Sequence, residues 1–237
     1  MRIGIFGGTG NMGRGLAVRW ALKHEVLVGS RSLGKAQRIA GELNRLARGF
    51  YQSEMRGGIA GVANADAARE AEVIVVALPP GVTVPALEEL RGHLRQEGIV
   101  VSTVVPMARR GGLFYFSAIS SEGLAGEGAS AAEVVREVVK PVPVVSAFQT
   151  VPAAYLSNID AVLNVDVLIA GDDDLAITVV SRLVRDIPNL RPLRVGPLEN
   201  SKWIESLTPL LLNAAVLNGL HDPSIRVVPW MPTSYEV

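Results

Sequence analysis

The chain has 237 residues, of which 49% are hydrophobic, enough to bury a substantial core in one large domain or two modest ones. Its 23 basic and 23 acidic side chains balance, so net charge favours neither nucleic acid nor an anionic membrane as a partner. Cysteine is absent, which excludes disulfides, thiolate metal ligands and a cysteine nucleophile. Since the chain opens on a strand-like pattern and has no apolar run of ~18 residues, we expect a cytoplasmic protein without a membrane span.

The first strand-like segment, residues 2–6, leads directly into the glycine-rich stretch GGTGNMG at residues 7–13. In a dinucleotide-binding turn of this spacing, Gly8 permits the tight turn and Gly10 lets the backbone approach a pyrophosphate. Gly13 lets the following helix pack close to the strand, and the N-terminus of that helix faces the phosphates. Because a helical pattern and a second strand follow, the context favours a nucleotide site over a glycine turn without a ligand.

The second strand ends at Ser30 and Arg31, where a site for NAD would place an acidic residue. A carboxylate there would repel a 2′-phosphate, whereas a guanidinium binds one through two charge-assisted hydrogen bonds and a serine hydroxyl adds another. Thr9 in the glycine loop and Lys35 can complete such a pocket. The sequence therefore predicts NADP; the alternative is a pair of solvated cations at a helix start, where the helix dipole disfavours them.

The rest of the chain alternates between strand and helix patterns, which predicts right-handed βαβ units and a parallel, doubly wound sheet. The expected strands after the second cover residues 59–62, 73–78, 99–103, 142–147, 166–170 and 193–195, and the expected helices cover 32–47, 66–70, a segment around 87–90, 130–139, 174–187 and 199–219. Residues 104–128 show no period and are expected to form a long functional loop. Residues 222–237 look like an extended tail that covers a surface.

Two further features concern a metal and the oligomeric state. The sequence Gly171 to Asp174 looks like an acidic metal loop, but a helix N-terminus attracts acidic residues, so we expect no metal. The helix at 199–219 contains Pro209, which should kink it. Its apolar residues lie on several faces, which predicts a homodimer.

Several segments recur together in one known family. They are the glycine motif, Gly29-Ser30-Arg31, Leu78-Pro79, Val101 to Pro106, Ser130 to Glu133, Val145 to Ala147, Pro152 to Ala154, Gly171 to Asp174, Leu190 to Leu193, Gly196 to Leu198 and Glu205 to Leu210. With them the chain resembles the NADP oxidoreductases that use the deazaflavin coenzyme F420. The glycine motif is shared by many reductases, whereas the later segments in this order are much more specific.

The resemblance implies an α/β fold: a Rossmann-type doubly wound parallel sheet, with residues 1–148 binding NADP and residues 149–237 forming a small, mainly helical C-terminal domain. It also implies that a hydride passes between C5 of the deazaflavin and C4 of the nicotinamide, in a cleft between the two parts. The protein would position the rings and exclude water, because the coenzymes carry the chemistry.

Site residues follow from the resemblance by position. Ser30, Arg31 and Lys35 would hold the 2′-phosphate, and the glycine loop with Thr9, Asn11 and Met12 would face the pyrophosphate and the nicotinamide side. The nicotinamide pocket would be lined by Leu78, Pro79, Val104, Val105, Pro106 and Met107. The deazaflavin would meet Gln149, Val151, Pro152, Ala153, Ser206, Leu207, Thr208 and Pro209, with Gln149, Ser206 and Thr208 as positioning residues. Gln149 stands where the family pattern has histidine; glutamine can donate a hydrogen bond to a ring carbonyl but cannot carry charge.

Two other functions are compatible with an NADP domain, since a fold alone does not fix the substrate. One is an NADPH-dependent reductase of another acceptor, such as a flavin, a ferric chelate or an imine. An imine reductase would need a proton donor in the cleft, and no Lys, His or Tyr stands out there. The other is a redox sensor that binds NADP without turnover, which closure of the cleft by Phe148, Tyr155 or the tail would favour.

Overall fold

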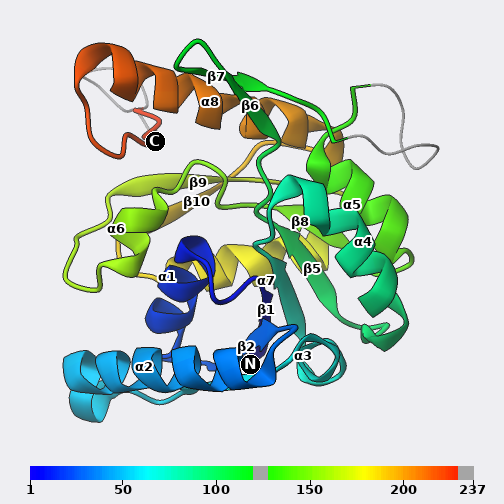
Figure 1. The fold of residues 1–237 in the computed structure, drawn as a ribbon, viewed down its shortest axis with the longest axis vertical. Coiled ribbons are helices and arrows are strands. Elements are labelled where there is room, and N and C mark those ends of the chain that lie inside the picture. Colours follow the sequence, from blue (N-terminus) through cyan, green and yellow to red (C-terminus); the bar gives the residue numbers. More distant parts are fainter. Residues whose placement is uncertain (120–127, 229–237) are drawn as a thin grey trace, which may run out of the picture.

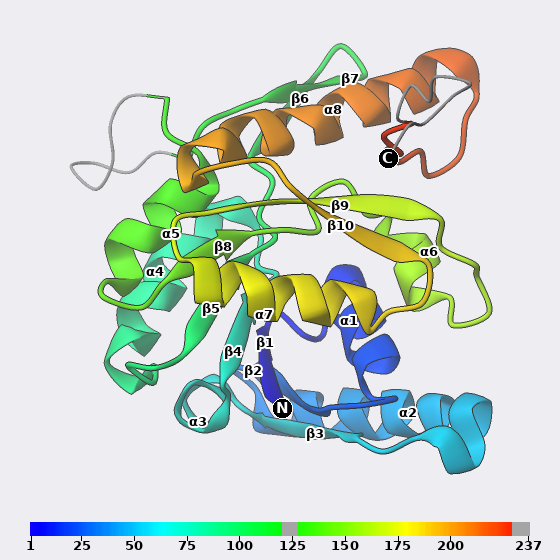
Figure 2. The same cartoon turned by 180° about the vertical axis from the view of Figure 1, so that it is seen from behind.

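The computed structural model describes residues 1–119 and 128–228, which form one mostly parallel sheet with helices on both faces (Figures 1 and 2). The sheet strands are β1 (Arg2–Phe6), β2 (Glu25–Ser30), β3 (Gly58–Ala63), β4 (Val73–Val76), β5 (Ile99–Ser102), β8 (Val144–Ser146), β9 (Val165–Gly171) and β10 (Leu190–Arg194); β6 (Met107–Arg110) and β7 (Leu113–Phe116) form a separate hairpin. The helices are α1 (Asn11–Trp20), α2 (Leu33–Tyr51), α3 (Asn64–Glu70), α4 (Pro80–Leu90), α5 (Ala131–Val139), α6 (Ala153–Ser157), α7 (Asp174–Arg185) and α8 (Ser201–Asn218), with short 3-10 turns at Gln52–Glu54, Arg91–His93 and Leu198–Asn200.

The strand order is β10-β9-β8-β5-β4-β1-β2-β3, and the neighbours pair in parallel except β8 with β9. This confirms the expected α/β class and the doubly wound arrangement. The region after residue 148 contributes helices and also β9 and β10, which extend the same sheet. The division into residues 1–148 and 149–237 therefore stays a prediction, and the sheet is continuous across it.

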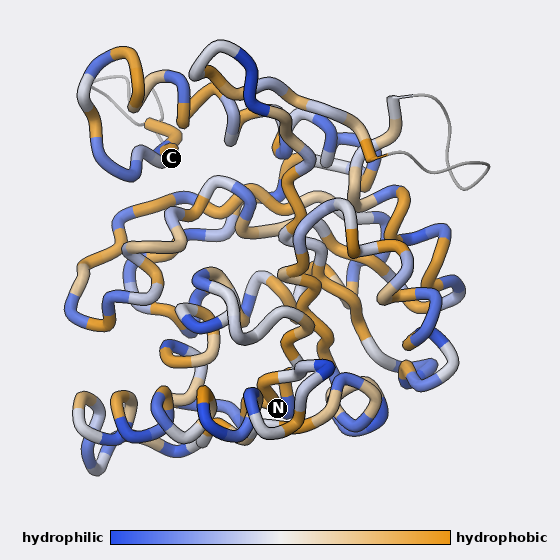
Figure 3. The backbone as a smooth tube through the Cα atoms, in the orientation of Figure 1, coloured by the Kyte–Doolittle hydropathy of each residue, from blue (hydrophilic) through white to orange (hydrophobic). Residues whose placement is uncertain are grey.

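The strands alternate their side chains between two cores. In β1, Ile3 and Ile5 join the core beneath α1, α2 and α7, while Phe6 joins the core beneath α3, α4 and α5. Because both faces are covered, the central strands are hydrophobic almost throughout, whereas α2 alternates in hydropathy along its length (Figure 3). Within residues 1–119 and 128–228, no helix combines the length and apolarity needed to cross a membrane.

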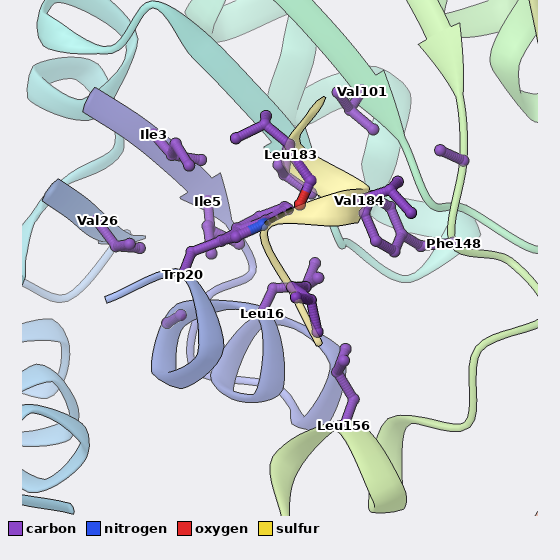
Figure 4. Packing of buried hydrophobic residues seen from close by; sticks show 14 of the residues in the cluster. Ile3, Ile5, Leu16, Trp20, Val26, Val101, Phe148, Leu156, Leu183 and Val184 are labelled. Carbon is purple, nitrogen blue, oxygen red and sulfur yellow. Dashed lines mark hydrogen bonds between the residues drawn. The ribbon is translucent and has the colours of Figure 1, made fainter. Parts of the chain in front are cut away.

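Trp20 joins distant parts of the first core. Figure 4 shows its side chain reaching from α1 toward Leu183 of α7 and toward Phe148. The indole N–H donates to the Leu183 carbonyl at 2.9 Å, and the ring meets Phe148 edge-on with 5.7 Å between centroids. Buried indole nitrogens need such a partner, so this contact combines apolar packing with a satisfied donor.

The expected loop at 104–128 was wrong over residues 107–116, where the β6–β7 hairpin forms. The hairpin lies beside α8 in both views of the fold (Figures 1 and 2). The side-chain amide of Asn213 on α8 accepts from the Phe114 N–H at 2.7 Å and donates to the Phe114 carbonyl at 2.8 Å. The hairpin thus owes part of its stability to a residue a hundred positions away, which local sequence does not show. Residues 120–127 of the expected loop lie outside the described residues.

The first part of the expected tail is attached to the sheet edge. The carboxylate of Asp166 on β9 is buried and accepts from Arg191 at 2.7 and 2.6 Å and from the Val227 N–H at 2.6 Å. The hydrogen bond from Arg191 holds the pKa of Asp166 below its ordinary value. The Asp166 N–H also donates to the Ile225 carbonyl at 3.0 Å, so Ile225 and Val227 lie beside β9, and residues 229–237 fall outside the described part of the chain.

A buried arginine joins α1 to the segment around α6. Arg19 is only 4% exposed, and its guanidinium donates to the carbonyls of Tyr155, Leu156, Asn158 and Ala161 at 2.8–3.2 Å. These carbonyls include the C-terminal end of the short helix α6, where a cation is favoured. Arg19 thus provides the hydrogen-bond donors that this irregular segment lacks.

We expect Arg19→Met to lower the free energy of unfolding by about 3 kcal/mol, because it leaves buried carbonyl oxygens without donors. Urea denaturation followed by circular dichroism measures this. Arg38→Met is the control, because the Arg38 side chain is 63% exposed and, within the described ranges, pairs only with Glu42 on the same helix; its cost should stay within about 0.5 kcal/mol. Equal effects of the two substitutions would contradict the structural role of Arg19.

Candidate functional site

The main pocket has a volume of about 610 Å³ and lies at the carboxyl ends of the parallel strands. This is the edge where open α/β sheets bind ligands, at the point where the strand order reverses between β1 and β4. The pocket is lined by Gly7, Thr9, Gly10, Asn11, Met12, Gly29, Ser30, Arg31, Lys35, Asn64, Ala77, Leu78, Pro79, Pro80, Val82, Thr103, Val104, Val105 and Gln149.

The glycine turn brings the N-terminus of α1 to this pocket. The left-handed backbone of the turn falls at Gly7, with φ +82°, rather than at Gly8. A Cβ on Gly13 would lie 2.6 Å from the Gly8 Cα, so Gly13 allows α1 to pack against the turn. A Cβ on Gly10 would meet only the Gly7 carbonyl, at 3.3 Å, which leaves the pocket side of Gly10 open. No side chain in the described part of the chain caps α1, so its first N–H groups are available to an anion.

One end of the pocket is cationic. It is formed by Ser30, at the end of β2, and by Arg31 and Lys35 around the start of α2. Ser32 caps α2 by accepting from the Lys35 N–H at 3.4 Å, which sets where the helix begins. Among the described residues neither Arg31 nor Lys35 has a carboxylate partner, whereas Arg2, Lys23, Arg38 and Arg69 each pair with one. Two unpaired cations at one pocket end favour an anionic ligand.

The other end of the pocket is apolar. After β4 the chain runs through Ala77, Leu78 and Pro79 into α4, and after β5 it runs through Val104 and Val105. The Thr103 hydroxyl donates to the Val76 carbonyl at 3.1 Å and joins the ends of the two strands. The walls of this end therefore come from two strands held at a fixed separation.

Gln149 lines the pocket between these walls and is 4% exposed. Its side-chain nitrogen donates to the Ser102 carbonyl at 2.9 Å and to the Ser146 hydroxyl at 2.8 Å. Both hydrogens of the amide are used inside the protein, so the expected donation to a ring carbonyl has no free N–H. The preceding residue, Phe148, has a left-handed backbone with φ +73°, which directs Gln149 away from the core that holds Phe148.

Helix α8 is attached to Gln149 and to the N-terminus of α5. The Thr208 hydroxyl donates to the backbone carbonyl of Gln149 at 2.9 Å. The fully buried carboxylate of Glu205 accepts from the Ala131 and Ala132 N–H groups at 2.9 and 3.1 Å, at the N-terminus of α5. Burial raises the pKa of Glu205 to about 8, against the opposing effect of these two hydrogen bonds.

The pocket brings together twelve of the residues expected to bind cofactors: Thr9, Gly10, Asn11, Met12, Ser30, Arg31, Lys35, Leu78, Pro79, Val104, Val105 and Gln149. The other expected residues do not line it. Gly8 lies in the turn and Gly13 packs against it. Met107 begins β6, after Pro106. Val151 is buried, Pro152 is the N-cap residue of α6, and Ala153 is the first residue of that helix. Ser206, Leu207, Thr208 and Pro209 are on α8, where the Ser206 hydroxyl bonds within the helix to the Lys202 carbonyl.

The pocket also includes residues that the sequence interpretation did not assign to it: Gly7, Gly29, Asn64, Ala77, Pro80, Val82 and Thr103. Most directly follow a strand or begin a helix at the same sheet edge, and this position is the sequence signal that could have identified them. Asn64, immediately after β3, is the only one among these seven with a side-chain amide.

The acidic loop before α7 has structural partners. Asp173 caps the helix through the Ala176 N–H at 2.7 Å, Asp172 accepts from the Leu198 N–H at 2.9 Å, and Asp174 pairs with Arg194 at 2.7 Å.

Neither Phe148 nor Tyr155 lines the main pocket. These two residues therefore do not close the cleft, which is the arrangement that would favour a redox sensor.

Comparisons with known proteins identify close relatives over nearly the whole chain. Residues 2–106 match the family described as NADP oxidoreductase coenzyme F420-dependent. A protein named F420-dependent NADP reductase from Methanocaldococcus jannaschii is 35% identical over 230 residues, which cover 96% of this chain and 98% of the relative. A protein of the same name from Methanothermobacter thermautotrophicus is 32% identical over 228 residues, covering 96% and 94%.

Solved structures show the same architecture. A putative F420-dependent NADP-reductase from an Arthrobacter species superimposes with a TM-score of 0.73 at 19% identity, covering 96% of this chain and 99% of that one. A pyrroline-5-carboxylate reductase from Coxiella burnetii gives a TM-score of 0.53 at 17% identity, covering 93% and 72%. At such low identity these two likenesses show the fold alone.

The attachment of α8 through Glu205 makes a pH-dependent prediction. The folded pKa of about 8 lies above the ordinary value of 4.5, so the folded protein keeps a proton that the unfolded chain releases. The stability due to this group is complete below pH 4.5 and falls as the pH rises toward about 8. The slope approaches about 1.4 kcal/mol per pH unit.

Glu205→Gln should remove this slope. We therefore expect the free energy of unfolding of the wild type, minus that of the variant, to decrease between about pH 5.5 and about pH 8, as measured by urea denaturation. Taking the difference cancels other titrating groups, including His24, whose burial lowers its pKa and gives a slope of the opposite sign. A difference that stays constant over this range would show that Glu205 is ionised in the folded protein.

Proposed function

The chain belongs to the family of F420-dependent NADP reductases, and we propose that the pocket at its sheet edge binds NADP(H) for hydride transfer to or from coenzyme F420. It is accordingly an NADP-dependent oxidoreductase. The observation that carries the assignment of the pocket is its polarity, because unpaired cations and a free helix N-terminus lead continuously to an apolar end. A dinucleotide has the same sequence of groups, from phosphates to a ring.

The residues present fit NADP. Arg31, Lys35 and Ser30 would hold the 2′-phosphate, since charge-assisted hydrogen bonds to a phosphate are strong and directional. The pyrophosphate would lie at Gly10, where the missing side chain leaves room beside the N–H groups of α1. Arg31, Lys35 and the first N–H groups of α1 lack another side-chain partner in the described part of the chain, and the Ser30 hydroxyl, which accepts from the Ser32 N–H at 3.2 Å, still has its hydrogen to donate.

The nicotinamide would lie at the apolar end, against Leu78, Val104 and Val105. When both coenzymes are bound, they supply the chemistry, a hydride passing between C4 of the nicotinamide and C5 of the deazaflavin. The protein's part is to orient two rings face to face and to exclude water. Gln149 would act as a wall of this space, with its amide held by Ser102 and Ser146.

The deazaflavin would lie on the open side of the nicotinamide, toward Met107 and the segment from Val151 to Ala153. Ser206, Leu207 and Pro209 on α8 would border the same space, and Thr208 would position Gln149 through its backbone carbonyl. We also propose a cytoplasmic location, because NADP and F420 are both soluble coenzymes of the cell interior.

Mixing the protein with NADPH and oxidised F420 in a stopped-flow instrument tests this function. We expect rapid loss of the F420 absorbance at the rate of NADPH oxidation, and much slower reaction with NADH, because Arg31 and Lys35 have no 2′-phosphate to bind in NADH. FMN, a ferric chelate and a cyclic imine are the comparison acceptors. Turnover with one of these and none with F420 would overturn the proposal, and so would NADPH binding without any turnover.

A homodimer is the second part of the proposal, supported by an apolar stripe along α8. Trp203, Leu210 and Leu217 are 67%, 62% and 69% exposed and recur every seven residues. Leu207 and Ala214, both partly buried, lie between them, so the stripe has the four-three spacing of helices that pack in pairs. A second copy of α8, related by a two-fold axis, would cover the stripe.

Leu210→Glu should convert the dimer into a monomer of 25.2 kDa, because it places a charge in the centre of the stripe. Light scattering after size-exclusion chromatography measures the mass. Leu175→Glu is the matched control, since Leu175 is 79% exposed on α7 and outside the stripe. If the wild type is monomeric, or if both variants stay dimeric, the proposed interface is wrong.

A further inference from the structure

Asn64 lines the main pocket, and the contacts of the fold give its side chain no structural role. It is the first residue of α3 and follows β3 directly. An asparagine near a helix start ordinarily caps it by accepting a backbone N–H. Here the cap position belongs to Ala63, and among the described residues no side chain caps α3 and none gives the buried Asn64 Oδ1 a hydrogen bond. An unpartnered buried amide oxygen carries a cost, which suggests that the side chain is kept for another purpose.

The amide oxygen of Asn64 lies against Gly29. A Cβ on Gly29 would lie 2.6 Å from Asn64 Oδ1, so the amide oxygen packs where the glycine has no side chain. The two polar atoms of an amide point in different directions from the same carbon. With the oxygen against Gly29, the nitrogen Nδ2 and its two hydrogens are left for the pocket that both residues line.

The surroundings of Nδ2 are those of an anion site. Asn64 shares this end of the pocket with Ser30, Arg31 and Lys35, and the described residues that line the pocket include no acidic one. Arginine and lysine attract an anion, while a neutral N–H donor on a short side chain adds a directional hydrogen bond. Asn64 begins α3 directly after β3, whereas Arg31 and Lys35 lie around the start of α2, so the donors come from two elements of the fold.

We infer that Asn64 determines specificity for the phosphorylated cofactor, donating from Nδ2 to an oxygen of the adenosine 2′-phosphate. The inference rests on the NADP site proposed above and assigns it one more donor. It also gives a reason for glycine at position 29, one residue before the end of β2, because a side chain there would displace the Asn64 amide.

Calorimetric titration with 2′,5′-ADP and with 5′-AMP tests the inference without F420 or turnover. Asn64→Ala should weaken binding of 2′,5′-ADP by about tenfold or more and leave 5′-AMP unchanged, because only the 2′-phosphate contact is lost. Asn64→Asp keeps the shape but puts a carboxylate beside the phosphate, so its loss for 2′,5′-ADP should be about a hundredfold, again without loss for 5′-AMP.

Two controls accompany these variants. Asn218→Asp makes the same change of charge at the exposed end of α8, outside the pocket, and should leave both affinities unchanged. Gly29→Ala should weaken 2′,5′-ADP binding in the wild type and much less in the Asn64→Ala background, since its effect acts through the Asn64 amide. Thermal denaturation of each variant without ligand shows that it is folded.

The outcomes separate this inference from the function on which it rests. If the wild type binds 2′,5′-ADP no better than 5′-AMP, the NADP site itself is wrong. If the wild type prefers 2′,5′-ADP and Arg31→Ala abolishes that preference while Asn64→Asp keeps it, the site stands and the role of Asn64 is wrong. Equal losses for both ligands in Asn64→Ala would place its contact on the adenosine and also overturn the inference.

Discussion

The pocket depends on one close approach of backbone to backbone, between the turn after β1 and the end of β4. Gly7 has φ +82°, and a side chain on it would come within 2.3 Å of the Ala77 carbonyl oxygen. The Ala77 N–H also donates to the Phe6 carbonyl at 2.9 Å, so the two strand ends are joined where the turn begins. Because of this contact, the N-terminus of α1 opens onto the ends of both strands. The N–H groups that suit a pyrophosphate and the apolar wall that suits a ring then face one space.

The contacts of α8 are a second constraint on the pocket. Glu205 attaches the helix to the N-terminus of α5, Thr208 attaches it to the Gln149 carbonyl, and Asn213 attaches it to the β6–β7 hairpin. Since these side chains lie on one helix, a shift of α8 moves all three contacts together. The position of Gln149 in the pocket wall is therefore coupled to packing well outside the pocket, which explains how residues of α8 can matter to the site without lining it.

Local patterns predicted the parts of the molecule that local physics determines. Strands buried on both faces are continuous apolar runs, so β4 and β5 were predictable, and a glycine motif between strand and helix identified the cofactor end. Other parts depend on contacts that join distant residues. The hairpin at 107–116 needs Asn213, and the pairing of the Gln149 amide needs Ser102 and Ser146 in the folded chain. Asn64 looks like any helix-start residue until Gly29 is placed beside it.

The division of the pocket into a cationic end and an apolar end also limits its chemistry. Arg31 and Lys35 line the first end, whereas the second is lined by Met12, Leu78, Val104 and similar residues without an ionisable side chain. Hydride transfer between two rings needs close contact without water, and it needs no acid or base from the protein. The apolar lining of the second end suits this requirement. Reduction of an imine would instead need a proton donor beside the ring. The ionisable side chains would bind the phosphate end of the cofactor, so binding energy is gained away from the reacting atoms. The apolar end would only position the rings and exclude water.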